Sequence, residues 1–512
     1  MQNDAFLEEI RSDPDDIIPR LVYADWLEEN GDSQAELIRV QCELDSLPVD
    51  SMAEREELRK REQELLQEYQ AEWVEPLKKL DVRGIEIKRG FVEGIRIDAE
   101  VFIEKAPEIV ERVPALCSLN LRKSRKAIRK LVKVPELEQL RFLDLRLADL
   151  EDQDLKTLLD SPYLTNLIGL NLQGNRLKAR GAGLLASCEK LSQLKSLNIA
   201  GNRIQAKGLV TLGKSSCLDE VTRLDAWNCH ISGKGLSDFA ATKGLPKLEF
   251  LDVAQNQFKD SISGFRKQIR PLKYLNISRS GIDREHANVI ATTPGLANLR
   301  ELRINGGVKG AGLVSLLTSK HLTSLQSLQA WMIHGTYSSQ RLALPGRFEG
   351  QGMKSLRRLD LADNALTTAA FEKIARSGCL ENVEELVLTG TALEDDGVAK
   401  ILAARPKRLS VLWIDNNNML TPKCLRHLAA WQGLRNLKRL ILPNASTLDV
   451  ESVATLLAAP HAEDLRIILF YHAEYTHQKE MRARLQEAWP DRFESLFVFP
   501  DWPDHRTAPF HS

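Results

Sequence analysis

Paired cysteines and an excess of charge of either sign are both missing from this sequence. The seven cysteines are widely spread and contain no Cys-x-x-Cys pair, which excludes the usual ligand spacing of a zinc site. The 70 Lys and Arg residues balance 71 Asp and Glu residues, so the net charge is −1 and the general attraction to nucleic acid is absent. We expect reduced thiols and no nucleic-acid partner, although a local basic patch is compatible with this balance.

Long apolar runs are missing as well. No uninterrupted apolar stretch reaches the roughly 18 residues that indicate a transmembrane helix. The opening residues, MQNDAFLEEIRSDPDD, are acidic and contain no apolar segment of the length that a secretory signal has. We therefore expect a cytoplasmic protein with no membrane partner.

The familiar motifs of catalysis and nucleotide binding are absent too. The sequence has no GxxxxGK[ST], GxSxG, HExxH or EF-hand segment. His472 and His477 flank a glutamate, but their spacing does not place both imidazoles on one helical face, so we expect no metal and no cofactor. GTPase activation needs a positioned arginine or asparagine, and no segment marks one. We expect no enzymatic activity and assign no catalytic residue.

What the sequence does contain is a repeat, which explains a length of 512 residues, well beyond one ordinary domain. The segment from Leu167 to Leu177 has the form L-x-x-L-x-L-x-x-N-x-L, and the same form begins again at Leu194. Most steps between copies are about 24 to 28 residues. We number the positions of each repeat from its first residue, and the proposed first residues are Val92, Leu116, Leu140, Leu167, Leu194, Val221, Leu248, Leu272, Leu299, Leu325, Leu356, Val383, Leu409, Leu437 and Leu465.

The pattern predicts a short strand followed by a helix. Alternation along a strand points the leucines inward and the residues between them outward. The asparagine at the ninth position is expected to hydrogen-bond backbone groups of neighbouring turns, as at Asn175, Asn202, Asn256, Asn364 and Asn417. Apolar residues at helical spacing follow, with a glycine at a fixed offset that favours close packing, as at Gly181, Gly208, Gly235 and Gly397.

This unit of a strand and a helix resembles the ribonuclease-inhibitor-like leucine-rich repeats, over roughly residues 90–485. The resemblance implies an α/β fold, a horseshoe-shaped solenoid with a parallel β-sheet on the concave side and helices on the convex side. It also implies protein binding, but the family includes recognition receptors, inhibitors and GTPase-activating proteins, so the fold does not choose among them.

The residues before the repeats have helical patterns over 14–31, 35–44 and 51–80. The third stretch interleaves opposite charges at helical spacing, which is typical of a solvated helix face, with a coiled-coil partner site as the alternative. A small all-α domain is therefore expected before the solenoid.

Part of this front segment is specific in sequence. It reads Arg20-Leu-Val-Tyr-Ala-Asp-Trp-Leu-Glu-Glu-Asn-Gly-Asp and then Ala35-Glu-Leu-Ile-Arg39-Val-Gln41. These residues resemble the repeat-companion domain of bacterial proteins, described chiefly from planctomycetes, and the turn Arg89-Gly-Phe-Val-Glu-Gly94 is similar to the start of the first strand in such proteins. The resemblance brings no established activity. The predicted domains are a helical companion-like domain over 1–80, the solenoid over 81–485, and a terminal strand with a loose tail over 486–512.

Two explanations are open for the aromatic and charged residues of the front segment, Tyr23, Asp25, Trp26 and Arg39. In the first explanation these residues form a binding site, because aromatic and charged residues cluster at interfaces. In the second, which we favour, Trp26 completes a core required by Leu21, Val22 and Leu27, and Asp25 or Arg39 pairs between helices. A front module of this kind also covers the apolar edge of the first repeat.

The repeat is irregular at two places. The step from Leu325 to Leu356 is the longest, and residues 335–350 lack the helical pattern, so we expect a loop insertion that either serves binding or is tolerated without a role. After Leu465, an apolar strand, a helix near 478–489 and the segment 496–499 predict a closing cap.

The outward strand residues, at the third, fifth and seventh positions, define the candidate binding face. The fifth position is Asn or Asp from Asn120 to Asn276 and mixed afterwards, and these side chains either hydrogen-bond one another or bind basic and amide groups of a partner. Trp, Tyr and Arg dominate interface hot spots. We therefore predict a protein partner on the concave strands, contacted by Arg223, Trp227, Phe250, Asp252, Tyr274, Arg303, Trp331, Arg358 and Trp413. The predicted function is a non-catalytic binding scaffold, and the alternatives are a regulator of an enzyme, such as a GTPase-activating or inhibitor protein, and a structural spacer.

Overall fold

The computed structural model forms two compact units. The first runs to Cys229 and includes Gly244–Lys247, and the second holds His230–Lys243 and the residues from Leu248 onward. The described residues are 2–12, 16–47, 52–333, 341–346, 352–442, 449–462, 464–469, 476–490 and 493–498.

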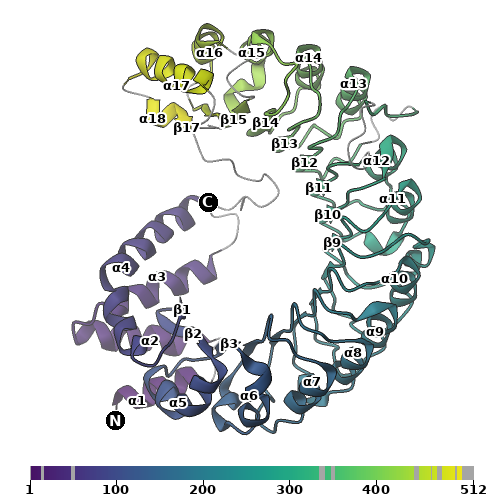
Figure 1. Cartoon of the computed structure of the whole chain (residues 1–512). Helices are drawn as coiled ribbons and strands as arrows, with labels where there is room; N and C mark the ends of the chain where they lie inside the picture. The colour runs from purple at the N-terminus through teal and green to yellow at the C-terminus, as the bar shows by residue number, and fades with distance from the viewer. Residues whose placement is uncertain are drawn as a thin grey trace. The chain divides into compact units, whose positions relative to one another are not determined.

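Four helices open the first unit (Figure 1): α1 (Gln2–Ser12), α2 (Ile18–Glu29), α3 (Gln34–Ser46) and α4 (Met52–Lys78). The three predicted helical stretches are confirmed, and α1 is an additional helix that the sequence pattern did not predict. Pro19 lies in the first turn of α2, where its fixed φ suits a helix start. The chain leaves α2 through Gly31 at a φ of 74°, a left-handed conformation that ends helices.

A mainly parallel sheet makes up the rest of the first unit. It begins with an antiparallel hairpin of β1 (Gly84–Lys88) and β2 (Phe91–Asp98). From β2 onward each strand pairs in parallel with the next: β3 (Ser118–Arg122), β4 (Phe142–Asp144), β5 (Gly169–Asn171), β6 (Ser196–Asn198) and β7 (Arg223–Asp225). The connecting helices are α5 (Ala99–Arg112), α6 (Ser124–Leu131), α7 (Asp152–Leu159), α8 (Ala179–Ala186) and α9 (Gln205–Leu212), with short 3-10 turns η1 (Pro135–Gln139) and η2 (Glu189–Leu191). In Figure 1 the strands of this unit lie along one side and these helices along the other.

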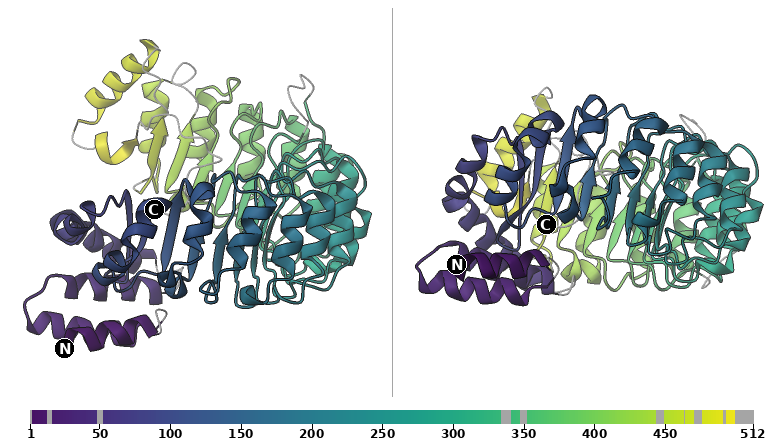
Figure 2. Two further views of the ribbon diagram at one scale, coloured as in Figure 1. Left: turned by 60° about the horizontal axis from the view of Figure 1, so that its bottom comes forward. Right: turned by 90° about the horizontal axis from the view of Figure 1, so that it is seen from below.

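The second unit repeats the same arrangement. Its parallel strands are β8 (Phe250–Asp252), β9 (Tyr274–Asn276), β10 (Glu301–Arg303), β11 (Ser327–Gln329), β12 (Arg358–Asp360), β13 (Glu385–Val387), β14 (Val411–Trp413), β15 (Arg439–Leu442), β16 (Arg466–Leu469) and β17 (Phe497–Val498). The helices are α10 (Gly233–Ala240), α11 (Arg284–Ala291), α12 (Lys309–Leu317), α13 (Thr368–Arg376), α14 (Asp395–Ala403), α15 (Pro422–Ala429), α16 (Val450–Leu457), α17 (Thr476–Ala488) and α18 (Phe493–Leu496), with 3-10 segments η3 (Ser263–Lys267), η4 (Pro294–Leu296) and η5 (Gln432–Asn436). The two views of Figure 2 show the strands of this unit, drawn in teal to green, side by side in one layer.

The strand register confirms every proposed repeat start except the last. Leu440, at a fourth position, pairs with Ile467, so the last repeat begins at Asp464 and not at Leu465. The prediction was wrong here because Ile467, Ile468 and Leu469 are consecutive apolar residues, which hide the alternation that fixes a register. Elsewhere the inward leucines are buried as expected, for example Leu170 and Leu172.

The ninth-position asparagines have the predicted structural role. Asn202 is buried, and its Nδ2 donates to the carbonyls of Leu172 and Ile199 at 2.8 and 2.9 Å. Its Oδ1 accepts the N–H of Leu177 at 3.0 Å. One side chain thus satisfies backbone groups of its own and the preceding repeat, which the short strands leave without ladder partners.

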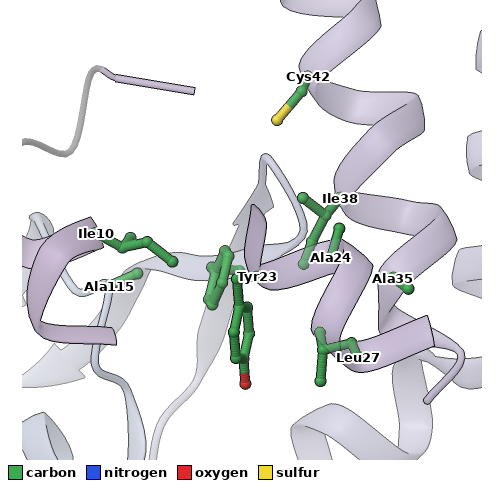
Figure 3. Packing of buried hydrophobic residues seen from close by; sticks show 9 residues of the cluster. Ile10, Tyr23, Ala24, Leu27, Ala35, Ile38, Cys42 and Ala115 are labelled. Atoms are coloured by element: carbon green, nitrogen blue, oxygen red, sulfur yellow. The ribbon is translucent and has the colours of Figure 1, made fainter. Parts of the chain in front are cut away.

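The front helices pack on the start of the sheet (Figure 3). Tyr23, Leu27 and Ile38 share an apolar core with Phe91 of β2 and with Ala115, which precedes β3. The rings of Tyr23 and Phe91 stack with centroids 5.7 Å apart. The helices therefore cover apolar side chains at the beginning of the repeats, as expected of an end module.

A buried polar contact accompanies this core. Arg20 of α2 is fully buried, with Nη2 2.9 Å from Oε1 of Glu93 on β2. Arg89 donates to both oxygens of Glu93, at 3.0 and 2.8 Å. The N–H of Gly90 donates to Oε1 of Gln41 on α3 at 2.7 Å. The turn between β1 and β2 is thus the surface on which the front helices dock.

The favoured explanation of the front aromatic and charged residues is confirmed with one exception. Tyr23 is buried, Trp26 is partly buried against the core, and Arg39 pairs with Asp25 at 2.7 Å between α2 and α3. Val22 is 46% exposed, so the prediction that it needs a core was wrong. It lies on the solvent side of a helix whose other face is already filled.

No helix within the described ranges combines the length and the apolar character needed to cross a bilayer.

Candidate functional site

The strand face, meaning the side chains at the third, fifth and seventh positions, has a hollow of about 400 Å³ in the first unit. Small third-position residues line it, namely Ser118, Gly169 and Ser196, and Phe142 stands among them with 43% of its surface exposed. A Cβ atom on Gly169 would lie 2.5 Å from Cδ1 of Phe142. The glycine therefore makes room for an aromatic ring that stays open to solvent.

Polar fifth-position residues line the same hollow: Asp144, Asn171, Asn198 and Asp225. Asn120 donates to Asp144 at 3.0 Å, so mutual hydrogen bonding, one of the two predicted explanations, occurs here. Asn198 instead accepts the N–H of Ala200 at 3.0 Å, which fixes the chain just after its strand. These contacts orient the side chains and leave donors and acceptors on the face.

Two of the predicted contact residues belong to the first unit. Arg223 lines the hollow, and its Nε lies 2.8 Å from Oδ2 of Asp225. Burial raises the pKa of Asp225, while the charge of Arg223 and its hydrogen bond oppose that rise. Trp227 is partly buried at a seventh position and does not line the hollow.

Four predicted residues meet on β8 to β10 of the second unit. The rings of Phe250 and Tyr274 stack with centroids 4.0 Å apart and planes inclined by 6°. The guanidinium of Arg303 lies over the Tyr274 ring at 5.4 Å. Asn276 donates to Asp252 at 2.9 Å, which is a second case of mutual hydrogen bonding along the fifth positions. An aromatic pair with a cation beside it is a common composition for interface centres.

The remaining predicted residues lie farther along the second unit. Trp331 and Trp413 are only 8% and 7% exposed and belong to one buried cluster with Val387. Nε1 of Trp413 donates to Oε1 of Glu385 at 3.1 Å, and Arg358 contacts the same carboxylate at 3.0 Å. These two indoles therefore present little surface to a partner.

Sequence reasoning missed Phe142, although the signal was available. Phe142 occupies a third position, as Phe250 and Tyr274 do, and the same criterion applied to β4 would have selected it. The small residues at third positions on either side of it, Ser118 and Gly169, were a second signal, because they leave an aromatic ring uncovered.

Metal and thiol chemistry have no organised site in the described part of the chain. No group of three or more His, Cys, Asp or Glu residues there is placed to hold a metal ion. All seven cysteines are free thiols, and burial raises the pKa of Cys117 and Cys229 to about 12. His472, residues 334–340 and 347–351 of the long step, and the tail from Asp501 lie outside the described residues.

Parallel strands, a helix or 3-10 segment in nearly every repeat and buried ninth-position asparagines define a leucine-rich-repeat solenoid. Residues 191–213 match the family model described as Leucine Rich repeat. No curated protein matches the chain in sequence.

Two solved structures are similar to this chain. An internalin from Listeria monocytogenes is 18% identical, with 67% of this chain and 94% of that one covered at a TM-score of 0.39. A chain from the Rad7 and Elc1 complex in yeast is 15% identical, with 80% and 94% covered at a TM-score of 0.39.

Proposed function

We propose that this chain is a non-catalytic scaffold that binds a protein partner on its strand face, centred in the first unit on Phe142. The exposed ring of Phe142 in a hollow is the observation that supports the proposal, because large aromatic side chains left open on a folded surface mark interaction sites. Asn171, Asn198 and Arg223 surround it with polar groups, so the hollow has the apolar centre and polar rim of a protein interface.

The second unit offers a further contact set. Phe250, Tyr274 and Arg303 form a continuous aromatic and cationic row, with Asp252 beside it. Stacking holds the two rings in place before binding, which lowers the entropy cost of association. We propose this row as the principal contact of the second unit, with Trp227, Arg358, Trp331 and Trp413 as lesser contributors.

The front segment also belongs to this proposal. We infer that residues 1–80 form a companion-like domain of a bacterial, cytoplasmic protein, that 81–485 form the solenoid, and that 486–512 form the terminal strand and tail. The docking of α2 and α3 on the Arg89 to Gly94 turn supports the assignment, because the residues of the resemblance are the ones in contact.

The test places a photo-reactive benzoylphenylalanine at position 142 of the full chain, and a second one at Lys207 as the control. Lys207 is exposed on helix α9, away from the strand residues. We expect one adduct of defined mass at position 142 and none at 207.

The partner identified in that adduct is then purified and titrated. Phe142→Ala should weaken its binding by about tenfold or more, since a buried aromatic at an interface centre contributes 2 kcal/mol or so. Equal crosslinking at both positions, or unchanged affinity of the folded Phe142→Ala variant, would exclude this site.

A further inference from the structure

A second hollow in the first unit is strongly basic. It has a volume of about 1040 Å³ and shares no lining residue with the hollow around Phe142. Six cationic side chains line this hollow, namely Arg96, Arg122, Lys123, Arg125, Lys126 and Arg146. Two aspartates, Asp149 and Asp154, line it as well. We call it the basic groove.

Part of this positive charge is compensated within the protein. Lys123 pairs with Asp98 at 2.7 Å, Arg125 pairs with Glu151 at 2.6 Å, and Arg146 pairs with Asp144 at the end of β4. Arg96 and Lys126 are exposed and form no ion pair with any described residue. The groove therefore keeps cations that are available to an anionic ligand.

The unusual feature of the basic groove is one exposed apolar side chain in its lining, that of Leu147. Leu147 is 76% exposed and lies at an eighth position with a φ of 55°. In the next two repeats the same position is Gly174 and Gly201, with φ values of 68° and 65°. A leucine is disfavoured in this left-handed conformation and gains little from burial here. The repeat sets this backbone conformation, and Lys123 has it at the same position of the preceding repeat. The Leu147 side chain lies against Gly174, where a Cβ atom would be 2.4 Å from its Cδ2. Most of its surface still faces solvent in the groove and is open to an apolar group of a ligand.

We propose that the basic groove binds an acidic peptide segment that carries one apolar side chain. Carboxylates of the peptide would face Arg96 and Lys126, and the apolar side chain would cover Leu147. A peptide fits better than nucleic acid because the exposed Leu147 offers an apolar contact that a peptide side chain can fill and a phosphate backbone cannot. This site goes beyond the strand-face function proposed above.

The test measures fluorescence anisotropy of the fluorescein-labelled peptide EDELEDE with the full chain at low salt. We expect saturable binding that weakens as salt is added, because exposed charges are screened. The peptide EDESEDE, which lacks the apolar side chain, should bind several-fold more weakly. The variant Arg96→Glu with Lys126→Glu should bind EDELEDE at least about tenfold more weakly. The matched control, Lys207→Glu with Lys214→Glu on and after α9, makes the same change in net charge at exposed positions and should leave affinity unchanged.

Leu147→Gly separates a ligand contact from a structural role. The glycine suits the left-handed backbone, so the melting temperature should stay the same or rise, while affinity for EDELEDE falls several-fold. A lower melting temperature with unchanged affinity would overturn the proposal, as would equal loss in both charge-reversal variants or tighter binding of a single-stranded oligonucleotide. Phe142→Ala should leave peptide affinity unchanged, so failure here and failure of the strand-face proposal are distinguishable.

Discussion

The guanidinium of Arg20 and the carboxylate of Glu93 form a buried ion pair, 2.9 Å apart, that joins a front helix to the first parallel strand. Arg89 also donates hydrogen bonds to Glu93, so one carboxylate contacts two guanidinium groups. Burial lowers the pKa of Arg20, and the charge of Glu93 opposes that effect. A charge removed from water is tolerated only while its partner remains, which makes Glu93 critical for docking.

Glu93→Gln should loosen the front helices. The substitution leaves the buried guanidinium of Arg20 and the partly buried guanidinium of Arg89 without their carboxylate, and breaking such a buried contact costs about 3 to 5 kcal/mol. We expect amide hydrogen exchange in α2 and α3 to accelerate strongly while exchange in α8 and α9 stays unchanged. Arg39→Ala is the control, because its pairs with the exposed carboxylates of Asp25 and Glu28 contribute about 1 kcal/mol or less each. Equal acceleration in both variants would contradict the role of the buried pair.

Gly90→Ala should have a similar local effect for a steric reason. Gly90 has a φ of 81°, and a Cβ atom there would lie 2.0 Å from Cγ1 and 2.7 Å from Cα of Ile38. The backbone of α3 would have to move, so we expect earlier proteolytic cleavage of the front helices. Gly31→Ala is a matched control with a φ of 74° and nothing within 4 Å. It should cost only the conformational strain of about 1 to 2 kcal/mol, and equal sensitivity of the two variants would refute the steric explanation.

The repeat could be predicted from sequence because its information is local. Each strand is specified by a few leucines at fixed spacing, and each buried asparagine has a fixed position, as Asn202 shows. The register failed only at the last repeat, where three consecutive apolar residues, Ile467 to Leu469, give no alternation.

The contacts that shape the candidate sites were harder to predict because they join distant segments. Nothing near Arg20 in the sequence indicates that its partner is Glu93. Trp331, Trp413 and Phe142 are all aromatic residues at outward strand positions. The two tryptophans are buried among neighbouring strand residues, whereas Phe142 is exposed because its neighbours on the face are small. The basic groove likewise collects cations from three successive repeats, which no single segment reveals.

Asn202→Ala should weaken the array far more than Asn198→Ala, four residues earlier. The Asn202 side chain makes four hydrogen bonds to backbone groups in the interior, and each buried group left without a partner costs about 1 to 3 kcal/mol. Asn198 is half-buried on the strand face, where water can replace its contact with Ala200. Urea unfolding followed by circular dichroism should show a clearly lower midpoint urea concentration for Asn202→Ala and a small change for Asn198→Ala. Similar midpoints would mean that the ninth-position bonds are not a major source of stability.

Asp415 makes the stability of the second unit depend on pH. Its side chain is buried, and burial raises its pKa to about 6, although the hydroxyl of Thr389, which donates at 2.6 Å, lowers it. An unfolded aspartate ionises near pH 4. The proton bound to folded Asp415 therefore contributes its full stabilisation below about pH 4, and this contribution is lost as the pH rises through about 6.

Asp415→Asn should remove that dependence, because the amide has nearly the same shape, still accepts the hydrogen bond from Thr389 and carries no ionisable proton. Relative to the native chain, the variant should gain about 2 to 3 kcal/mol of unfolding free energy between pH 4 and pH 7, the equivalent of a pKa displaced by about two units. Thr389→Val should act in the opposite direction, because it removes a hydrogen bond that favours the ionised form of Asp415. In this variant, which keeps Asp415, the free energy of unfolding should fall more steeply as the pH rises. Urea unfolding of the second unit at pH 4, 5, 6 and 7 measures all three chains, and parallel curves for the native protein and Asp415→Asn would show that Asp415 is not the group responsible.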